Sequence, residues 1–179
     1  MSSNCKGVFY NMIKYEPKNF LNLDKPKLLE IYCDGSASGN GQTNAKGGWA
    51  CVFEYGSPAL IYFIDGFEKN STNQRMELIA AINAAKVVKF IALGAIIYTD
   101  SAYLYNCWKD GWWVKWELNG WLNSKKEPVV NRDLWEQLIP YFNSKQIKWI
   151  KVKGHSGNKL NEIADKLAVA AYNKYNKEG

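Results

Sequence analysis

Apolar and polar residues alternate in three short segments near the start of the chain, a pattern that is typical of β-strands. Residues 28–34 (LLEIYCD) alternate clearly, and residues 47–55 and 59–67 are rich in aromatic and β-branched side chains. The tripeptide GSP between the last two segments is typical of a hairpin turn. The pattern therefore predicts three consecutive antiparallel strands.

Apolar residues then recur at helical spacing, at positions 78, 82, 85 and 88, which predicts a long helix over residues 76–90. Ser71, followed three residues later by Gln74, predicts a capping box at the start of this helix. Residues 94–100 (GAIIYTD) are almost wholly apolar, as expected of a central strand that is covered on both faces. If this strand lies parallel to the first, the helix provides a right-handed crossover.

The following segment is dominated by aromatic residues. Residues 101–123 are rich in tryptophan, and we expect them to be helical, with a break at Gly111 and an end at Gly120. Asn131 predicts the cap of a further helix that extends through Phe142.

Two more elements complete the predicted domain. Residues 146–154 alternate as a half-exposed edge strand does, and residues 158–172 have the spacing of an amphipathic helix. This order predicts an α/β fold with a mixed five-stranded sheet, the first three strands antiparallel, and helices on both faces. Residues 1–26 show no period, so we interpret them as an N-terminal extension of a single domain over residues 27–175.

The composition is that of a globular protein. The 179 residues are 47% hydrophobic and 22% charged, which suits one domain with a buried core. No apolar run approaches the roughly 20 residues of a membrane helix, and the N-terminus lacks the apolar stretch of a signal peptide. We therefore expect a cytoplasmic monomer without a membrane partner.

The spacing of the cysteines and the net charge limit which metal sites and partners the sequence supports. The four cysteines lack CxxC spacing, which indicates neither a disulfide framework nor a zinc site. The net charge of +6 and the pI near 9.0 favour a polyanionic partner. Charge alone does not identify that partner, so a nucleic-acid interpretation needs a site to support it.

Four acidic side chains fall where the predicted elements can bring them together. Asp34 and Asp100 each stand where an apolar strand gives way to polar residues, at the edge where open α/β sheets place ligands. Glu77 lies in the first turns of the long helix and Asp165 on the last helix, so both can face this edge. Each acid alone also has an ordinary explanation, as part of a turn, as a helix cap or as a solvated helix position.

Carboxylates that are gathered in this way raise one another's pKa values, so they need a proton or a cation to coexist. Oxygen ligands without a Cys or His cluster favour Mg²⁺ or Mn²⁺ over zinc. Two such ions can activate a water and stabilise the leaving oxygen of a phosphodiester, which makes hydrolysis of that bond the natural chemistry. His155, the only histidine, lies in the loop KGHSGNK, where an imidazole can transfer a proton.

Four segments carry these residues: YCDGSASGN, STNQRMELIAAI, YTDSAYLYN and VKGHSGNKLNEIADKLA. In order and spacing, from residue 28 to about 171, they resemble the active-site motifs of type 1 ribonuclease H, which cuts the RNA strand of RNA/DNA hybrids. The resemblance implies a ribonuclease H-like fold and an endonuclease that leaves 5′-phosphate and 3′-hydroxyl ends. It also implies two Mg²⁺ ions, for which Mn²⁺ can substitute, held by Asp34, Glu77, Asp100 and Asp165, with His155 as the loop histidine.

The resemblance further implies contacts with the hybrid. Thr72 and Asn131 match positions that contact a DNA phosphate, and Asn73 and Gln74 match two amides in the minor groove. Amides can read base edges and sugars there, and the 2′-hydroxyl is what separates RNA from DNA.

Two more contacts follow from the same resemblance. The main-chain amides of the loop that begins with Gly35 and Ser36 match partners of the 2′-hydroxyl, and Trp112 and Trp116 match the substrate handle that cups the DNA strand. Packing of tryptophans against the core is the alternative interpretation of Trp116.

The chain departs from the family pattern at two places. The DNA-phosphate pocket usually contains an arginine where this chain has Asn70, for which Lys69 offers a compensating charge. The handle, residues 101–128, is nearly neutral, with four lysines and three acids. We therefore expect phosphate affinity from lysines near the last strand, namely Lys145, Lys148, Lys151, Lys153 and Lys159.

Two other functions stay open. A 3′ to 5′ exonuclease of the same acidic type usually has two acids separated by one residue on the first strand, whereas Asp34 is followed by Gly35 and Ser36. A non-catalytic hybrid- or RNA-binding protein has no reason to keep four mutually repelling carboxylates. The start Met and the absence of a polymerase segment indicate a free-standing enzyme.

Overall fold

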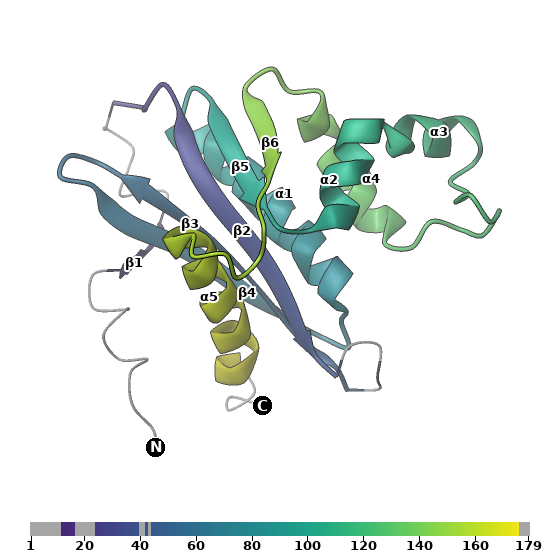
Figure 1. Cartoon of the computed structure of the whole chain (residues 1–179), viewed down its shortest axis with the longest axis horizontal. Helices are drawn as coiled ribbons and strands as arrows, with labels where there is room; N and C mark the ends of the chain where they lie inside the picture. Colours follow the sequence, from purple (N-terminus) through teal and green to yellow (C-terminus); the bar gives the residue numbers. More distant parts are fainter. Residues whose placement is uncertain (1–11, 17–23, 40–41, 43, 176–179) are drawn as a thin grey trace.

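The computed structural model describes residues 12–16, 24–39, 42 and 44–175, with a mixed β-sheet at its centre (Figure 1). Its strands are β1 (Met12–Lys14), β2 (Leu29–Ser38), β3 (Lys46–Tyr55), β4 (Leu60–Lys69), β5 (Ala95–Thr99) and β6 (Ile147–Lys151). They lie in the order β1-β4-β3-β2-β5-β6. β2, β3 and β4 pair antiparallel, as predicted, and β5 lies parallel to both β2 and β6.

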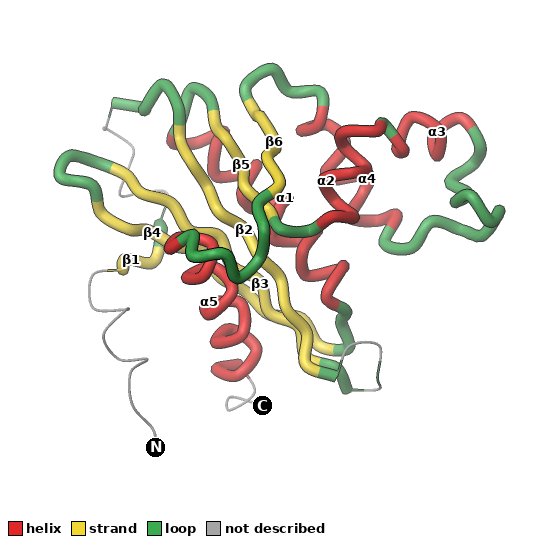
Figure 2. Tube along the Cα trace, viewed as in Figure 1, coloured by secondary structure: helices red, strands yellow, loops and turns green. Residues whose placement is uncertain are grey.

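Helices cover both faces of this sheet, which confirms the predicted fold class. They are α1 (Asn73–Ile91), α2 (Ala102–Asp110), α3 (Trp112–Leu118), α4 (Arg132–Phe142) and α5 (Lys159–Tyr175). α1 packs on β2 and β3 with α4 beside it, and α5 packs on β2, β3 and β4 from the opposite face (Figures 1 and 2). α2 and α3 extend from the end of β5 away from the sheet (Figure 1).

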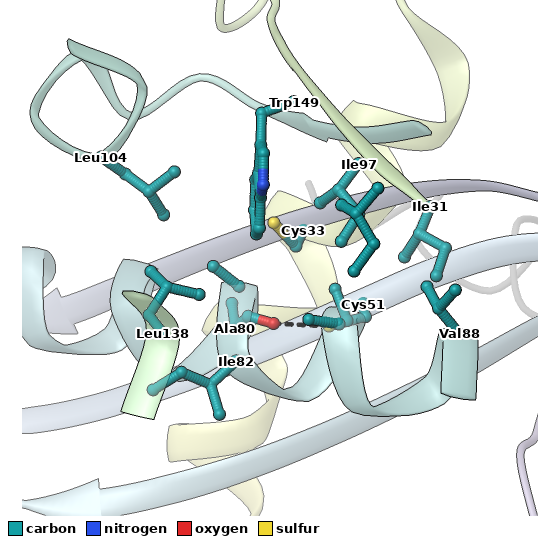
Figure 3. Close-up of a cluster of buried hydrophobic side chains, with 14 of the residues drawn as sticks. Ile31, Cys33, Cys51, Ala80, Ile82, Val88, Ile97, Leu104, Leu138 and Trp149 are labelled. Atoms are coloured by element: carbon teal, nitrogen blue, oxygen red, sulfur yellow. Dashed lines mark hydrogen bonds between the residues drawn. The ribbon is translucent and has the colours of Figure 1, made fainter. Parts of the chain in front are cut away.

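The core fixes which residues of each strand face which helix. Ile31 and Cys33 of β2 belong to the larger core beside α1, whereas Tyr32 between them belongs to a smaller cluster beneath α5. Figure 3 shows Ile31 and Trp149 within the larger core. Because a shift of one residue would move every side chain to the other face, this burial fixes the strand register and the positions of the polar residues that follow.

A sixth strand was not predicted from the sequence. β1 lies in the N-terminal extension and pairs parallel with β4, with Met12 opposite Ile61. The Lys14 ammonium group lies 2.5 Å from Asp65 Oδ1. Three residues are too few to show alternation, and the partner strand is distant in sequence, so periodicity carries no signal of this pairing.

The start of α1 differs from the predicted capping box. Thr72 is the N-cap, and its Oγ1 accepts a hydrogen bond from the backbone N–H of Arg75 at 3.2 Å. Ser71 lies one residue too early for this role, and its hydroxyl instead donates to Glu68 Oε2 at 2.8 Å. The cap is therefore supplied by a residue that the resemblance assigns to substrate binding.

The later helix boundaries largely follow the pattern. Gly111, with a φ of 61°, separates α2 from α3 as predicted. α4 begins directly after Asn131 and ends at Phe142, but Asn131 has a φ of 58° and its side chain makes no cap hydrogen bond. Asn131 is therefore the N-cap residue, as predicted, but only its backbone carbonyl oxygen accepts from the first turn, and its side-chain amide is used elsewhere, as described below.

Cys33, Cys51 and Cys107 are free and buried, and Cys5 lies outside the described residues. The Cys51 thiol donates to the carbonyl oxygen of Ala80 at 3.1 Å, the contact drawn in Figure 3. Within the described part of the chain, every helix is too short or too polar to cross a membrane.

Candidate active site

Asp34 and Asp100 lie level with each other on adjacent parallel strands. Tyr32 of β2 pairs with Tyr98 of β5, and the same offset places Asp34 opposite Asp100. Asp100 directly follows β5, as predicted, but β2 continues beyond Asp34 to Ser38, so Asp34 lies within its strand. There it is only 8% exposed.

Gly35 allows α1 to lie directly against the strand that carries Asp34. A Cβ atom at Gly35 would lie 2.2 Å from the carbonyl carbon of Met76 and 2.3 Å from the nitrogen of Glu77, so only glycine permits this approach. The Gly35 N–H also donates to Asp34 Oδ1 at 2.7 Å. The expectation that Gly35 and Ser36 open a loop is wrong, because both residues lie in β2.

Ser101 connects Glu77 to the start of α2. The Ser101 hydroxyl donates to Glu77 Oε2 at 2.5 Å and accepts from the backbone N–H of Leu104 at 3.3 Å. Ser101, rather than Asp100, is therefore the N-cap of α2, and the carboxylate of Asp100 is not used as a cap. The sequence indicated a helix cap at this junction but gave no sign of the contact between Ser101 and Glu77.

The loop after β6 closes the site from above. A Cβ atom at Gly154 would lie 2.8 Å from Asp100 Oδ2, so the loop backbone passes directly over that carboxylate. His155 follows with a φ of 50°, and its Nδ1 lies 3.9 Å from Asp165 Oδ2. The imidazole is 83% exposed, so it lies at the rim of the site and not in the core.

Burial and neighbouring carboxylates raise the pKa values of two of the acids, Asp34 and Glu77. Burial, followed by the charge of Asp100, raises the pKa of Asp34 to about 8, with smaller contributions from Asp165 and Glu77. Burial and the Asp100 charge also raise the pKa of Glu77, and the hydrogen bond from Ser101 opposes that rise. The structure thus brings together all four acids that the sequence singled out, since the charges of Asp100, Asp165 and Glu77 all act on Asp34.

The donors at this site fit a hard divalent cation. All four are carboxylates, the ligand type that Mg²⁺ and Mn²⁺ prefer. Among the described residues, no three Asp, Glu, His or Cys side chains are already arranged closely enough to hold one ion. The fit therefore rests on the donor chemistry and on the burial and repulsion that raise the Asp34 pKa, because a cation would offset both effects on the charged carboxylate.

Predicted substrate residues surround the first turn of α1. Thr72 caps the helix, and the side-chain oxygen of Asn73 accepts from the backbone N–H of Ala37 at 2.6 Å, which connects α1 to the end of β2. Gln74 lines a pocket of about 630 Å³ beside the helix. The side-chain oxygen of Asn73 is therefore already used in a hydrogen bond within the protein.

Aromatic rings form much of this pocket. Trp112 and Trp116 line it together with Tyr103, and the two indoles lie 6.4 Å apart between centroids. Trp116 is only 7% exposed and packs edge-on against the buried Trp135 at 5.4 Å. Most of the Trp116 surface is therefore covered by core packing, whereas the half-buried Trp112 leaves part of its ring exposed.

Arg75 is a residue of this region that the sequence did not single out. Its guanidinium lies 2.8 Å from Glu68 Oε2 and 3.0 Å from Asp133 Oδ2. It also donates to Asn131 Oδ1 at 3.5 Å, which joins the end of β4 and the starts of α1 and α4. A cation in the first turn of a helix opposes the helix dipole, and this was the signal available in the sequence.

The match to known proteins covers nearly the whole domain. The ribonuclease H family model matches residues 26–173. The chain belongs to the ribonuclease H family. Curated relatives named ribonuclease H support this assignment: that of Caldanaerobacter subterraneus subsp. tengcongensis is 46% identical over 85% of this chain and 95% of its own length, and that of Moorella thermoacetica is 46% identical over 81% and 91%.

Structural similarity agrees with the family assignment. The crystal structure of LC9-RNase H1, a type 1 RNase H with the type 2 active-site motif, superposes with a TM-score of 0.70 at 28% identity, over 86% of this chain and 75% of that one. The resemblance to type 1 ribonuclease H is thus confirmed, and the chain is a ribonuclease H enzyme.

Proposed function

We propose that this ribonuclease H is an endonuclease that hydrolyses the RNA strand of RNA/DNA hybrids and leaves 5′-phosphate and 3′-hydroxyl ends. The supporting observation is the state of Asp34, which is buried beside three other acids and has its pKa raised to about 8. Such a cluster suits a cation-dependent reaction at a phosphate. Family membership supports the reaction class.

The proposed cofactor is a pair of Mg²⁺ ions, for which Mn²⁺ can substitute. Held by Asp34, Glu77, Asp100 and Asp165, they would supply an activated water and stabilise the leaving oxygen. The protein's own contribution is to fix the ligand oxygens, through the Gly35 N–H on Asp34 and the Ser101 hydroxyl on Glu77. Such supporting hydrogen bonds orient metal ligands in proteins.

His155 is proposed to transfer a proton at the rim of the site. Its exposure allows exchange with solvent, and its position 3.9 Å from Asp165 supports a role beside the reacting phosphate. An imidazole is suited to this task because it changes charge near neutral pH.

Recognition of the hybrid is proposed to involve the residues around α1 and the pocket. Trp112 would pack against deoxyribose of the DNA strand, with Gln74 in the adjoining minor groove. Thr72 and Asn131 would contact a DNA phosphate, and Asn73 the minor groove after exchange of its bond to Ala37. Because the Gly35 N–H already binds Asp34, we assign the contact with the RNA 2′-hydroxyl to Ser36.

A panel of substrates tests the proposed function. The protein is incubated with Mg²⁺ and an end-labelled RNA/DNA hybrid, duplex DNA, duplex RNA or single strands. We expect internal cuts in the RNA of the hybrid alone. Stepwise loss of nucleotides from an end would instead support a 3′ to 5′ exonuclease, and binding without cleavage would support a hybrid-binding protein. We further propose that the protein is monomeric and cytoplasmic.

A further inference from the structure

The positive charge of the chain is concentrated in one segment. Residues 143–161 contain five lysines and no aspartate or glutamate, in a chain whose net charge is +6. Residues 101–128, which include the aromatic pocket, contain four lysines and three acids. We call the five side chains the β6 lysine stripe: Lys145, Lys148, Lys151, Lys153 and Lys159.

The stripe lies on the outer edge of the sheet. β6 is the last strand, paired on one side with β5, and Figure 1 shows it at the edge away from α5. Its Ile147 and Trp149 are buried, whereas Lys148 and Lys151 are exposed. The ion pairs found among the described residues include none of the five lysines, so their charge is available to a partner.

The stripe leads directly to the catalytic acids. The Val152 N–H donates to the carbonyl oxygen of Thr99 at 2.9 Å, and Gly154 then lies over Asp100. Lys153 therefore stands beside the acids, and Lys148 lies about 17 Å further along an extended chain. That length corresponds to roughly five base pairs of a nucleic-acid helix.

Protection of an edge strand explains only part of this pattern. Lysines on edge strands deter pairing with other molecules, which accounts for Lys148 and Lys151. Lys153 and Lys159 lie beyond the strand, in the loop and at the start of α5, where no strand edge needs protection. The feature that all five share is their position in one segment without acids, which frames both faces of the edge strand and leads to the acidic site.

We propose that the β6 lysine stripe binds the phosphates of the RNA strand on one side of the cleavage point. This rests on the proposed function, because the strand that reaches the four acids is then the RNA, and the lysine segment adjoins the acids through Gly154. The stripe supplies the phosphate affinity that the nearly neutral handle lacks. Each lysine that neutralises a phosphate releases a counterion, so binding depends on salt concentration.

The test compares two variants that lose the same charge. In an Asp100→Asn background, which keeps the substrate intact, hybrid binding is measured by fluorescence anisotropy over a range of salt concentrations. Lys148→Gln/Lys151→Gln is expected to weaken binding about tenfold near 0.1 M salt and to lower the slope of log K against log salt by about 1.5. The control, Lys86→Gln/Lys89→Gln, alters exposed lysines near the far end of α1 and is expected to change the slope by less than a third of that amount.

Neutral phosphates identify the strand that is bound. Uncharged methylphosphonates replace the phosphates of one strand on one side of the cleavage point. In the RNA, they are expected to remove the difference in salt dependence of binding between the stripe variant and the parent. In the DNA of the same side, they are expected to preserve that difference. Equal slopes for both lysine pairs would overturn the proposal, as would a difference that depends only on the DNA phosphates. These outcomes are distinct from failure of the proposed function, which is absence of hybrid cleavage by the wild-type protein.

Discussion

Ser101 donates its hydroxyl hydrogen to Glu77 Oε2 at 2.5 Å while it accepts from the Leu104 N–H, so one side chain caps α2 and orients the Glu77 carboxylate. Ser101→Ala should cost about 1 kcal/mol in the free energy of unfolding through the lost cap. It should also weaken Mg²⁺ binding by about 10- to 100-fold, because the Glu77 oxygen loses its fixed orientation. Calorimetric titration of Mg²⁺ and urea denaturation measure the two effects.

Ser101→Thr is the matched control, since it keeps a hydroxyl that can cap the helix and donate to Glu77. It should restore most of the Mg²⁺ affinity. If Ser101→Ala lost stability but bound Mg²⁺ as tightly as wild type, the contact of Ser101 with Glu77 would not orient a metal ligand.

The raised pKa of Asp34 predicts how the metal-free protein responds to pH. The carboxyl group has a pKa of about 8 when folded and about 3.9 when unfolded, so the folded state binds more protons between these values. Without metal, stability should therefore fall as pH rises from 4 to 8. Asp34→Asn should flatten this dependence and raise metal-free stability at pH 8 by at least about 1.4 kcal/mol, the equivalent of one pKa unit.

Thermal unfolding in the presence of EDTA measures this effect, and Asp110→Asn, which removes an exposed carboxylate outside the site, is the control. Added Mg²⁺ should raise the midpoint more at pH 8 than at pH 5, because binding requires charged carboxylates. The prediction would be contradicted if the metal-free stability of wild type rose between pH 5 and pH 8 while that of Asp34→Asn did not.

Gly35→Ala tests the close packing of α1 on β2. The added methyl group would meet the Met76 carbonyl carbon at 2.2 Å, and backbone cannot move aside as a flexible side chain can. We expect a loss of about 3 kcal/mol in urea denaturation and loss of activity, because α1 moves away with Glu77. Gly94→Ala, whose new methyl group would come no closer than 3.3 Å to carbonyl oxygens, should cost less. Equal costs at the two positions would contradict this packing argument.

The main elements could be predicted because each has an apolar period long enough to identify its type and its buried face. That periodicity placed Asp34 and Asp100 on neighbouring strands, and Glu77 at the start of a core-facing helix. Asp34 was nevertheless placed at the end of its strand, because the four residues that follow it in β2 are glycine, serine and alanine, which are too small to form an apolar alternation. The four acids could be identified from the sequence, because residue type and order along the chain were enough to single them out.

Contacts between distant side chains could not be predicted. Ser101 meets Glu77 across 24 residues, and Arg75 meets Asp133 across 58, and no local pattern encodes either distance. β1 was missed for the same reason, since a three-residue strand depends entirely on its partner. Asn131 is the N-cap as predicted, but its side-chain oxygen accepts from Arg75 of another helix and not from the first turn of α4.

Cleavage of an end-labelled RNA/DNA hybrid by wild type and Asp100→Asn, side by side with Mg²⁺, tests the central claim most directly. The amide keeps the shape of the side chain and removes the negative charge that a cation requires. We expect internal RNA cuts by wild type, none when EDTA is present, and a fall of at least about 100-fold in rate for a variant that is folded by circular dichroism. Equal cleavage by the two proteins, or none by wild type, would contradict the central claim.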